Sequence, residues 1–415
     1  MTRSRRSVPV LALGSALNGL LAYLLFALVT RGLGAEGSAP VTVLWTLWAF
    51  AGAALTFPVQ HWVAATVARD GEGAVRHALP SVLGWASAAA LLLGGLSWMA
   101  ADSLFHRGGP AFPAMVAAIT LGAAVVGVTR GGLAARGRFS ALALELVLEN
   151  TLRCLLVAAL LVAGVHNPAA HGLALVAGQL IVVAWPSALR FGTEGRAAAG
   201  EGPFAYLAGA GFAQLVSQCL LTGAPVVVAL AGGSAAEVTA LFAGLALFRA
   251  PYLLSIGVMP TVTARATVLV LDGDAHTLRR ADRAVLAAGV LGAAAAAVFG
   301  GYAGPWLLRT VFGSDVDLAP HLAAMVAAGC TLAVANLVLV VLGLAHRRPG
   351  GVARAWGAGI VAAVVLFGVL TGDAVSDRTT AAFLLAEAVA FAGLQLVSTR
   401  SVRALAGSTR PLAAP

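Results

Sequence analysis

Long apolar runs separated by short polar segments follow one another along the whole chain. Most are about 20 residues or longer, the length at which an α-helix crosses the hydrocarbon core of a bilayer. Twelve such runs occur, at residues 8–30, 40–66, 78–101, 112–134, 140–163, 169–189, 204–231, 237–262, 283–305, 320–345, 352–371 and 380–399. The pattern predicts an all-α, polytopic integral membrane protein with about 12 transmembrane helices.

The composition supports a membrane protein and excludes several classes of enzyme. Apolar residues make up 60% of the 415 positions, charged residues only 10%, and the mean hydropathy is +0.92, so a soluble fold is excluded. All basic residues are arginine. Without lysine the chain has no Walker A motif, no Schiff-base lysine and no Ser-x-x-Lys nucleophile, and therefore no ATPase motor of its own. We expect neither a cofactor nor a metal, because the cysteines lie far apart within apolar runs and no His/Glu cluster has metal-ligand spacing.

The arginines are unevenly distributed between the segments that join the apolar runs. If the N-terminus is inside, the inner segments hold twenty arginines and the outer segments four. Positively charged residues accumulate in short cytoplasmic loops, so we expect both termini to be cytoplasmic. This distribution also accounts for the net charge of +9. A nucleic-acid partner is therefore not expected.

A polar segment rich in Gly and Ala divides the twelve runs into six and six. The expected parts are an N-terminal six-helix lobe at residues 1–190, a cytoplasmic linker at 191–203, a C-terminal six-helix lobe at 204–402 and a cytoplasmic tail at 403–415. A weak repeat supports the division, because Gly-Ser-Ala at residues 37–39 recurs at residues 233–235. Two halves with six spans each share one orientation, which is typical of transporters whose substrate path lies between the halves.

Five ionisable residues lie well inside the predicted spans. An ionised side chain at the bilayer centre costs at least about 2.5 kcal/mol, so each of the five is a candidate functional residue. Glu145, Glu149 and Arg153 follow one another at helical spacing and form a charged face on the fifth span. Arg249 in the eighth span and Glu387 in the twelfth complete the set.

These charged residues also have structural explanations. Glu149 and Arg153 would neutralise each other as an i, i+4 pair. Glu145 has no further arginine on its own span, so we expect it to be hydrated, protonated or paired across a cavity. Arg249 would form a salt bridge between the lobes with Glu145 or Glu387.

Three side-chain amides lie at a similar depth. Asn18 in the first span and Gln214 in the seventh fall near the expected midplane, and Gln218 follows Gln214 by one helical turn. For both glutamines, hydrogen bonding between helices is the alternative to ligand binding.

Four short segments carry a resemblance to a known family. They are Arg31-Gly32-Leu33-Gly34-Ala35-Glu36-Gly37, Gly137-Arg138-Phe139, Phe248-Arg249-Ala250-Pro251 and Phe312-Gly313-Ser314-Asp315. In this order they resemble the R-x-L-G-P-E loop, the start of the fifth span, the R-x-P signature of the eighth span and the F-G-x-E loop of one transporter family. That family is the polysaccharide transporter branch (Wzx-type lipid-linked oligosaccharide flippases) of the multidrug/oligosaccharidyl-lipid/polysaccharide exporter superfamily.

The resemblance implies a MATE-like pair of six-helix lobes that alternate access. Such a carrier moves a polyprenyl-pyrophosphate-linked saccharide from the inner to the outer leaflet. Guanidinium groups hold phosphate bidentately, so Arg249 is the first expected phosphate contact and Arg153 the second. The other expected substrate contacts are Arg31, Asn18, Gln214 and Gln218.

The same interpretation names the residues and partners for ion coupling. Glu145, Glu149 and Glu387 would carry protons or sodium ions, or would release the phosphate by competing for the arginines. The expected partners are the lipid-linked saccharide, H⁺ or Na⁺, membrane lipids and the enzymes of glycan assembly. The carrier is expected to be monomeric and to lie in the inner membrane of a bacterial cell.

Two other functions stay open. A multidrug or cation antiporter of the same superfamily would use the acidic residues and would not need arginine to recognise a cationic drug. An integral-membrane glycosyltransferase or polymerase is less well supported, because the predicted outer loops are too short to build a catalytic site. We therefore expect a carrier and not an enzyme.

Overall fold

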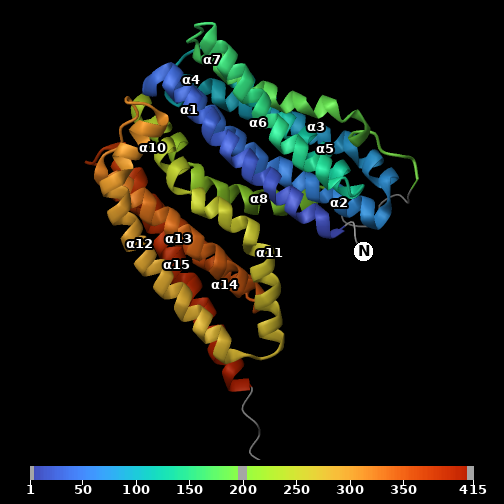
Figure 1. Cartoon of the computed structure of the whole chain (residues 1–415), viewed down its shortest axis with the longest axis vertical. Coiled ribbons are helices and arrows are strands. Elements are labelled where there is room, and N and C mark those ends of the chain that lie inside the picture. The colour runs from blue at the N-terminus through green and yellow to red at the C-terminus, as the bar shows by residue number, and fades with distance from the viewer. Residues whose placement is uncertain (1–3, 195–202, 409–415) are drawn as a thin grey trace, which may run out of the picture. The chain divides into compact units, whose positions relative to one another are not determined.

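The computed structural model describes residues 4–194 and 203–408, and within these ranges all regular structure is helical (Figure 1). The described chain has seven helical stretches that are long and apolar enough to cross a membrane, the first of which contains two of the predicted runs. Each predicted run coincides with one helical element or with two or three consecutive ones. The all-α prediction is therefore confirmed. Residues 195–202 of the predicted linker and 409–415 of the predicted tail lie outside the described residues.

The chain forms two compact units, of which the first comprises Met1–Thr239 and Val311–Val316. Its helical elements are α1 (Ser4–Ala51), the π-helical η1 (Gly52–Thr56), α2 (Phe57–Asp70), α3 (Glu72–Met99), α4 (Ala101–Phe105), α5 (Ala111–Ala135), α6 (Phe139–Val162), α7 (Pro168–Ala177), the 3₁₀ segments η2 (Gly178–Ala184) and η3 (Pro186–Ala188), α8 (Pro203–Thr222) and α9 (Ala224–Leu230).

The second unit comprises Ala240–Thr310 and Asp317–Pro415. It contains most of α10 (Ala235–Phe248) and α12 (Ala275–Phe312), together with α11 (Ala250–Leu271), α13 (Pro320–Ala345), α14 (Pro349–Val369) and α15 (Val375–Ser408).

Helix α8 belongs to the first unit because it packs closely on η1 and α2. A Cβ atom at Gly211 would lie 2.6 Å from the carbonyl oxygen of Ala54, so only glycine permits this approach. The division expected from the sequence instead groups residues 204–402 into a C-terminal lobe. The two expected lobes stay a prediction.

Helix α1 consists of two helices that meet at Gly34, where φ is 72° and ψ is 176°. This backbone region is essentially restricted to glycine. Two carbonyl groups at the break gain side-chain donors: Ser38 Oγ donates to the carbonyl of Gly34, and Thr239 Oγ1 donates to that of Ala35, each at 2.7 Å. The first predicted outer loop is therefore a tight break within a continuous helical run.

Glycine also brings α5 close to α2 and η1. A Cβ atom at Gly127 would lie 2.8 Å from the carbonyl oxygen of Thr56, and one at Gly131 would lie 2.6 Å from Cβ of Val63. Small residues are the usual means by which membrane helices approach, since lipid supplies no hydrophobic driving force between them. Thr56 Oγ1 also donates to the carbonyl of Ala123 at 2.9 Å, which fixes η1 against α5.

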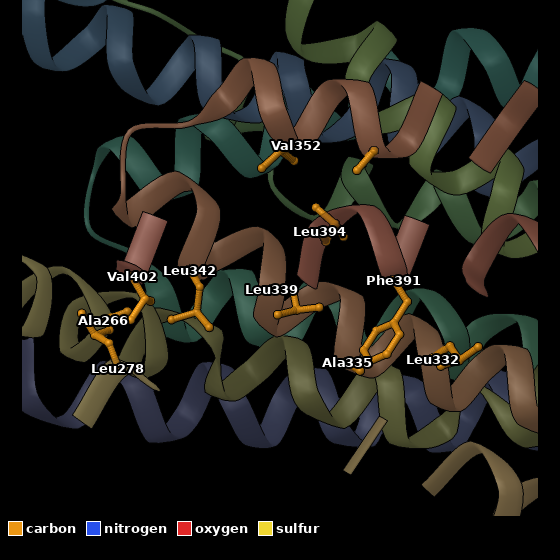
Figure 2. Packing of buried hydrophobic residues seen from close by; sticks show 11 residues of the cluster. Ala266, Leu278, Leu332, Ala335, Leu339, Leu342, Val352, Phe391, Leu394 and Val402 are labelled. Carbon is orange, nitrogen blue, oxygen red and sulfur yellow. The ribbon is translucent and has the colours of Figure 1, made fainter. Parts of the chain in front are cut away.

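In the second unit, α15 packs against both α13 and α14. Buried side chains from α11, α12, α13, α14 and α15 form one apolar cluster, shown in Figure 2. Leu339, Leu394 and Phe391 lie near its middle, and Leu278 and Val402 lie at one end.

The start of α12 is capped from outside the helix. The backbone N–H of Thr277 donates to Asp274 Oδ1 at 2.9 Å. Hydrogen bonds from the hydroxyl and backbone N–H of Thr277 lower the pKa of the half-buried Asp274 carboxyl. The carboxylate therefore satisfies one of the free N–H groups at the helix start.

Gly34→Ala is expected to destabilise the protein by about 1 to 3 kcal/mol, because alanine is strained in this backbone region. Gly19→Ala, on the same helix, is the matched control. A Cβ atom there meets nothing within 4 Å, so the change should be less than about 1 kcal/mol. Unfolding of both variants in SDS measures the difference, and equal stabilities would contradict the assigned break.

Candidate functional site

Four charged side chains form a buried network between α5 and α6. Arg130 Nε donates to Glu145 Oε2 at 2.8 Å, and Arg130 Nη2 donates to Glu149 Oε2 at 2.5 Å. Arg153 Nη2 donates to the other oxygen of Glu149, also at 2.5 Å. All four side chains are buried. With two arginines and two glutamates, the network is formally neutral when every group is ionised.

Arg153 is enclosed on all sides. Besides its bond to Glu149, its Nη1 donates to Asn150 Oδ1 and its Nε to the carbonyl of Leu175, both at 2.9 Å. Its guanidinium carbon lies 4.5 Å from the ring centre of Trp48. The exposed fraction of Arg153 is 0%. A phosphate would therefore contact this side chain only after the network opened, and the expected substrate role of Arg153 stays a prediction.

The network extends to α1 through two asparagines. Asn150 Nδ2 donates to Asn18 Oδ1 at 2.8 Å and to the carbonyl of Asn18 at 3.2 Å. The predicted binding residue Asn18 thus lies beside the charged face, and Asn150, which the sequence interpretation missed, connects the two. Its position between Glu149 and Arg153 on the same span was the available signal.

The pairing of Glu145 differs from the sequence expectation. The sequence predicts hydration, protonation or pairing across a cavity, because Glu145 has no further arginine on its own span. Arg130 lies inside α5, directly before Gly131. Because α5 packs closely on α2 at Gly131, this part of the helix is buried together with Arg130. The i, i+4 pair of Glu149 and Arg153 does form, and Arg130 enlarges it.

One oxygen of the network has no partner. Glu145 Oε1 is buried and accepts no hydrogen bond from the part of the chain that the structure describes. Because Arg130 binds the other oxygen, Glu145 keeps one free acceptor while Glu149 has both oxygens occupied. Among the predicted ion-coupling residues of the first unit, Glu145 is the one with capacity for a further cation or proton.

The remaining predicted arginines lie in different units. Arg31 is exposed, and its Nε donates to the carbonyl of Val311 at 3.1 Å. Arg249 occupies the break between α10 and α11 in the second unit, with its guanidinium carbon 5.9 Å from the ring centre of Phe242. Arg31 thus belongs to the first unit and Arg249 to the second.

The two predicted glutamines lie on α8. Gln214 is exposed. Gln218 Nε2 donates to Thr222 Oγ1 at 3.0 Å, a bond within the same helix rather than between helices. Neither amide joins the charged network.

Glu387 is buried on α15 and is paired with an amide. Asn336 Nδ2, on α13, donates to Glu387 Oε2 at 2.8 Å and to the carbonyl of Glu387 at 3.0 Å. Asn336 Oδ1 is buried and has no hydrogen-bond partner among the described residues. Unlike Glu145 and Glu149, Glu387 is thus a buried carboxylate that accepts from a neutral group.

The first unit also contains a cavity of about 650 Å³, which the sequence interpretation missed. Its lining comes from η1, α2, α3, α5 and α8 and comprises Ala54, Leu55, Val59, His77, Ala78, Ser81, Val82, Trp85, Ala86, Ala89, Ala124, Phe204, Leu207, Gly211 and Leu215. Only His77 and Ser81 offer polar side chains apart from the indole N–H of Trp85. The ring centres of Trp85 and Phe204 are 4.3 Å apart. The sequence contained no signal for it, because α3 and α8 are distant along the chain.

The described residues include no group of three or more His, Cys, Asp or Glu side chains that would hold a metal ion. The chemistry available at these sites is therefore that of guanidinium, carboxylate, amide and aromatic groups.

Several solved transporters have the same fold. The chain superposes on an inward-facing multidrug resistance MATE family transporter of the MOP superfamily with a TM-score of 0.66 and 16% identity, over 94% of this chain and 96% of that chain. The eukaryotic MATE transporter AtDTX14 gives a TM-score of 0.54 and 14% identity over 99% of both chains. A MOP superfamily transporter from Pyrococcus furiosus gives 0.54 and 16% over 96% of both chains.

These comparisons define the class of the protein: a polytopic, all-helical membrane protein with the fold of MATE transporters of the MOP superfamily. No protein-family model and no curated protein matches the chain by sequence. The likeness shows the fold expected from the sequence, whereas the superfamily and its flippase branch stay predictions. The three superposed proteins named above are transporters.

Arg130→Ala is expected to destabilise the protein by about 3 to 5 kcal/mol, because it leaves buried carboxylates without their counter-charge. The control is Arg309→Ala, which removes an exposed pair with Asp317 at 3.3 Å and should cost at most about 1 kcal/mol. SDS unfolding of both purified variants measures the two losses. A loss at Arg130 no larger than that at Arg309 would show that the network is not a stabilising element.

Proposed function

We propose that the protein is a secondary transporter that moves apolar or amphiphilic organic compounds across the membrane. The observation that carries the proposal is the cavity of about 650 Å³ in the first unit, lined by apolar and aromatic side chains. Sites for small organic ligands have about 300 to 1,000 Å³ and a mostly apolar lining with few polar groups. The fold of MATE transporters supports carrier activity.

The aromatic side chains suggest how such a compound would be held. Trp85 and Phe204 are both partly exposed and in contact, at 4.3 Å between ring centres. Aromatic rings stack on flat ligands and attract cationic ones through their faces. His77 and Ser81 would add hydrogen bonds that orient the ligand.

The buried charges of the first unit fit an apolar cargo. Glu149 and Arg153 are engaged by groups of the protein itself. A ligand in the cavity would therefore meet its apolar lining without having to displace an ion pair.

Trp85→Ala is expected to reduce efflux of a fluorescent amphiphilic dye from cells at least severalfold, because it removes the largest aromatic surface of the cavity. Trp98→Ala is the matched control, since Trp98 is also exposed on α3 but does not line the cavity. Efflux is followed after expression of each variant at equal membrane levels in a drug-sensitive host. No efflux by the unmodified protein across a panel of cationic, neutral and anionic dyes would reject this function.

A second candidate is translocation of a lipid-linked saccharide. It is favoured by the position of Arg249 at a helix break, within a segment that resembles the flippase signature. Arg249 is the N-cap of α11, and the N-terminus of a helix attracts anionic groups. Arg153 would first have to leave three protein acceptors before it could contact a phosphate.

Arg249→Ala is expected to abolish saccharide translocation if this candidate is correct, whereas Arg265→Ala, an exposed arginine on α11, should leave it unchanged. The measurement is the amount of lipid-linked saccharide on the cytoplasmic leaflet in a deletion strain carrying each variant. If the deletion strain accumulates no such lipid, the flippase candidate is excluded. Transport of organic compounds, measured by dye efflux, then remains as the proposed function.

Ion coupling is compatible with either candidate function. Of the three predicted ion-coupling residues, Glu387 and Glu145 have partners that leave the most room for a proton or sodium ion, because an amide donates to Glu387 and one oxygen of Glu145 has no partner among the described residues. Glu149 is held by two guanidinium groups. An inner-membrane location with cytoplasmic termini, a monomeric state and partners in glycan assembly remain proposals.

A further inference from the structure

A group of buried oxygen atoms between α12 and α15 lies apart from the sites described above. Asp282, on α12, is buried. Its Oδ2 accepts from Thr399 Oγ1 at 2.8 Å. Its Oδ1 is buried and has no hydrogen-bond partner in the described chain.

Two neighbouring side chains on α15 are in the same condition. Gln395 Nε2 donates to the backbone carbonyl of Asp282 at 3.3 Å, which leaves Gln395 Oε1 buried and without a partner among the described residues. Ser398 Oγ is likewise buried and without a partner there. Hydroxyl groups of the same helix usually bond to the carbonyl four residues earlier, as those of Thr380 and Ser401 do. Ser398 Oγ forms no such bond within the described chain.

These residues share one face of α15. Positions 395, 398 and 399 follow one another at i, i+3 and i+4, which places them side by side on a helix. Thr399 and Gln395 both bond to Asp282, so this face meets α12 at that residue. We call this group, Asp282 with Gln395, Ser398 and Thr399, the oxygen cluster.

Apolar side chains flank the oxygen cluster along both helices. Leu278 and Val402, one turn from Asp282 and Ser398, belong to the buried cluster of the second unit, and so does Phe391, one turn before Gln395 (Figure 2). The oxygen cluster is therefore a polar layer between apolar layers. Every buried polar group of this kind calls for a partner.

Five arginines lie near Asp282 along α12 and α15. Arg279, Arg280 and Arg283 on α12 and Arg400 and Arg403 on α15 are exposed. Arg279 Nε donates to the carbonyl of Ala275. Asp282 forms no salt bridge with any described residue.

We propose that the oxygen cluster binds a single hard monovalent cation, with Na⁺ as its natural occupant. Hard cations take carboxylate, amide and hydroxyl oxygens as ligands. One carboxylate matches one positive charge, and the neutral oxygens of Gln395, Ser398 and Thr399 replace part of the hydration shell. A water molecule would satisfy the free hydrogen-bonding atoms but would leave the buried carboxylate charge uncompensated.

The consequence is a tie between α12 and α15. A cation at Asp282 is held by ligands from both helices, so the bound ion stabilises their packing in the native state. The site is at the end of the second unit that the arginine distribution predicts to face the cytoplasm. It does not depend on which cargo the protein carries.

The test measures the melting temperature of the purified full-length protein by its tryptophan fluorescence. NaCl is titrated against N-methyl-D-glucamine chloride at constant ionic strength and pH. A ligand that binds only the native state raises the melting temperature in a concentration-dependent way. We expect such a rise for the unmodified protein, its loss in Asp282→Asn, and its retention in Asp272→Asn, an exposed acid of the same unit.

A second variant keeps the test decisive if Asp282→Asn fails to fold. Ser398→Ala preserves the charge and removes one neutral ligand, so it should raise the half-saturating Na⁺ concentration by about tenfold, a usual size for the loss of a supporting group at a metal site. Equal melting temperatures in the two salts for the unmodified protein would overturn the proposal. So would an undiminished Na⁺ response in a folded Asp282→Asn, or a stabilisation that follows pH through Asp282 and ignores Na⁺.

Discussion

The mutual neutralisation of buried charges between α5 and α6 constrains the rest of the first unit. An isolated guanidinium or carboxylate is costly in hydrocarbon, and leaving one member without its partner costs more than the pair gains. Arg130 bridges Glu145 and Glu149, and Arg153 holds the second oxygen of Glu149. Such a network sets the rotation of both helices, because turning either one would expose a charge to an apolar neighbour. Through Asn150 and the carbonyl of Leu175, it also fixes α1 and α7.

Helix α5 separates two environments with different chemistry. Toward α6 it carries Arg130, whereas Ala124 lines the apolar cavity on the side of α2, α3 and α8. The close approach at Gly127 and Gly131 makes this division possible, since a larger residue at either position would push α2 and η1 away. The charged side chains thus lie on the α6 side of α5, and mainly aromatic and aliphatic side chains line the cavity. The proposal of an organic cargo rests on this separation.

The two units treat their buried carboxylates differently. In the first, guanidinium groups compensate them, so the carboxylates serve the structure unless the network opens. In the second, Glu387 accepts from Asn336, and Asp282 accepts from Thr399. A carboxylate whose described donors are neutral has no fixed counter-charge from them, and a mobile cation or proton is the natural complement. The proposed ion coupling therefore has more suitable carboxylates in the second unit than in the first.

Hydropathy and helical spacing are local properties of the chain, and they were enough to predict the helical class, the positions of the apolar runs and the charged face on α6. The sequence also identified Glu145, Glu149, Arg153 and Glu387 as charges that need an explanation. The packing of the helices shows that Arg130 pairs with Glu145 and that Asn336 donates to Glu387. It also shows that α3 and α8 help to line an apolar cavity. Each of these depends on how two helices are rotated and how closely they approach. That geometry arises from packing at positions such as Gly131 and Gly211, and no periodicity along the chain records it.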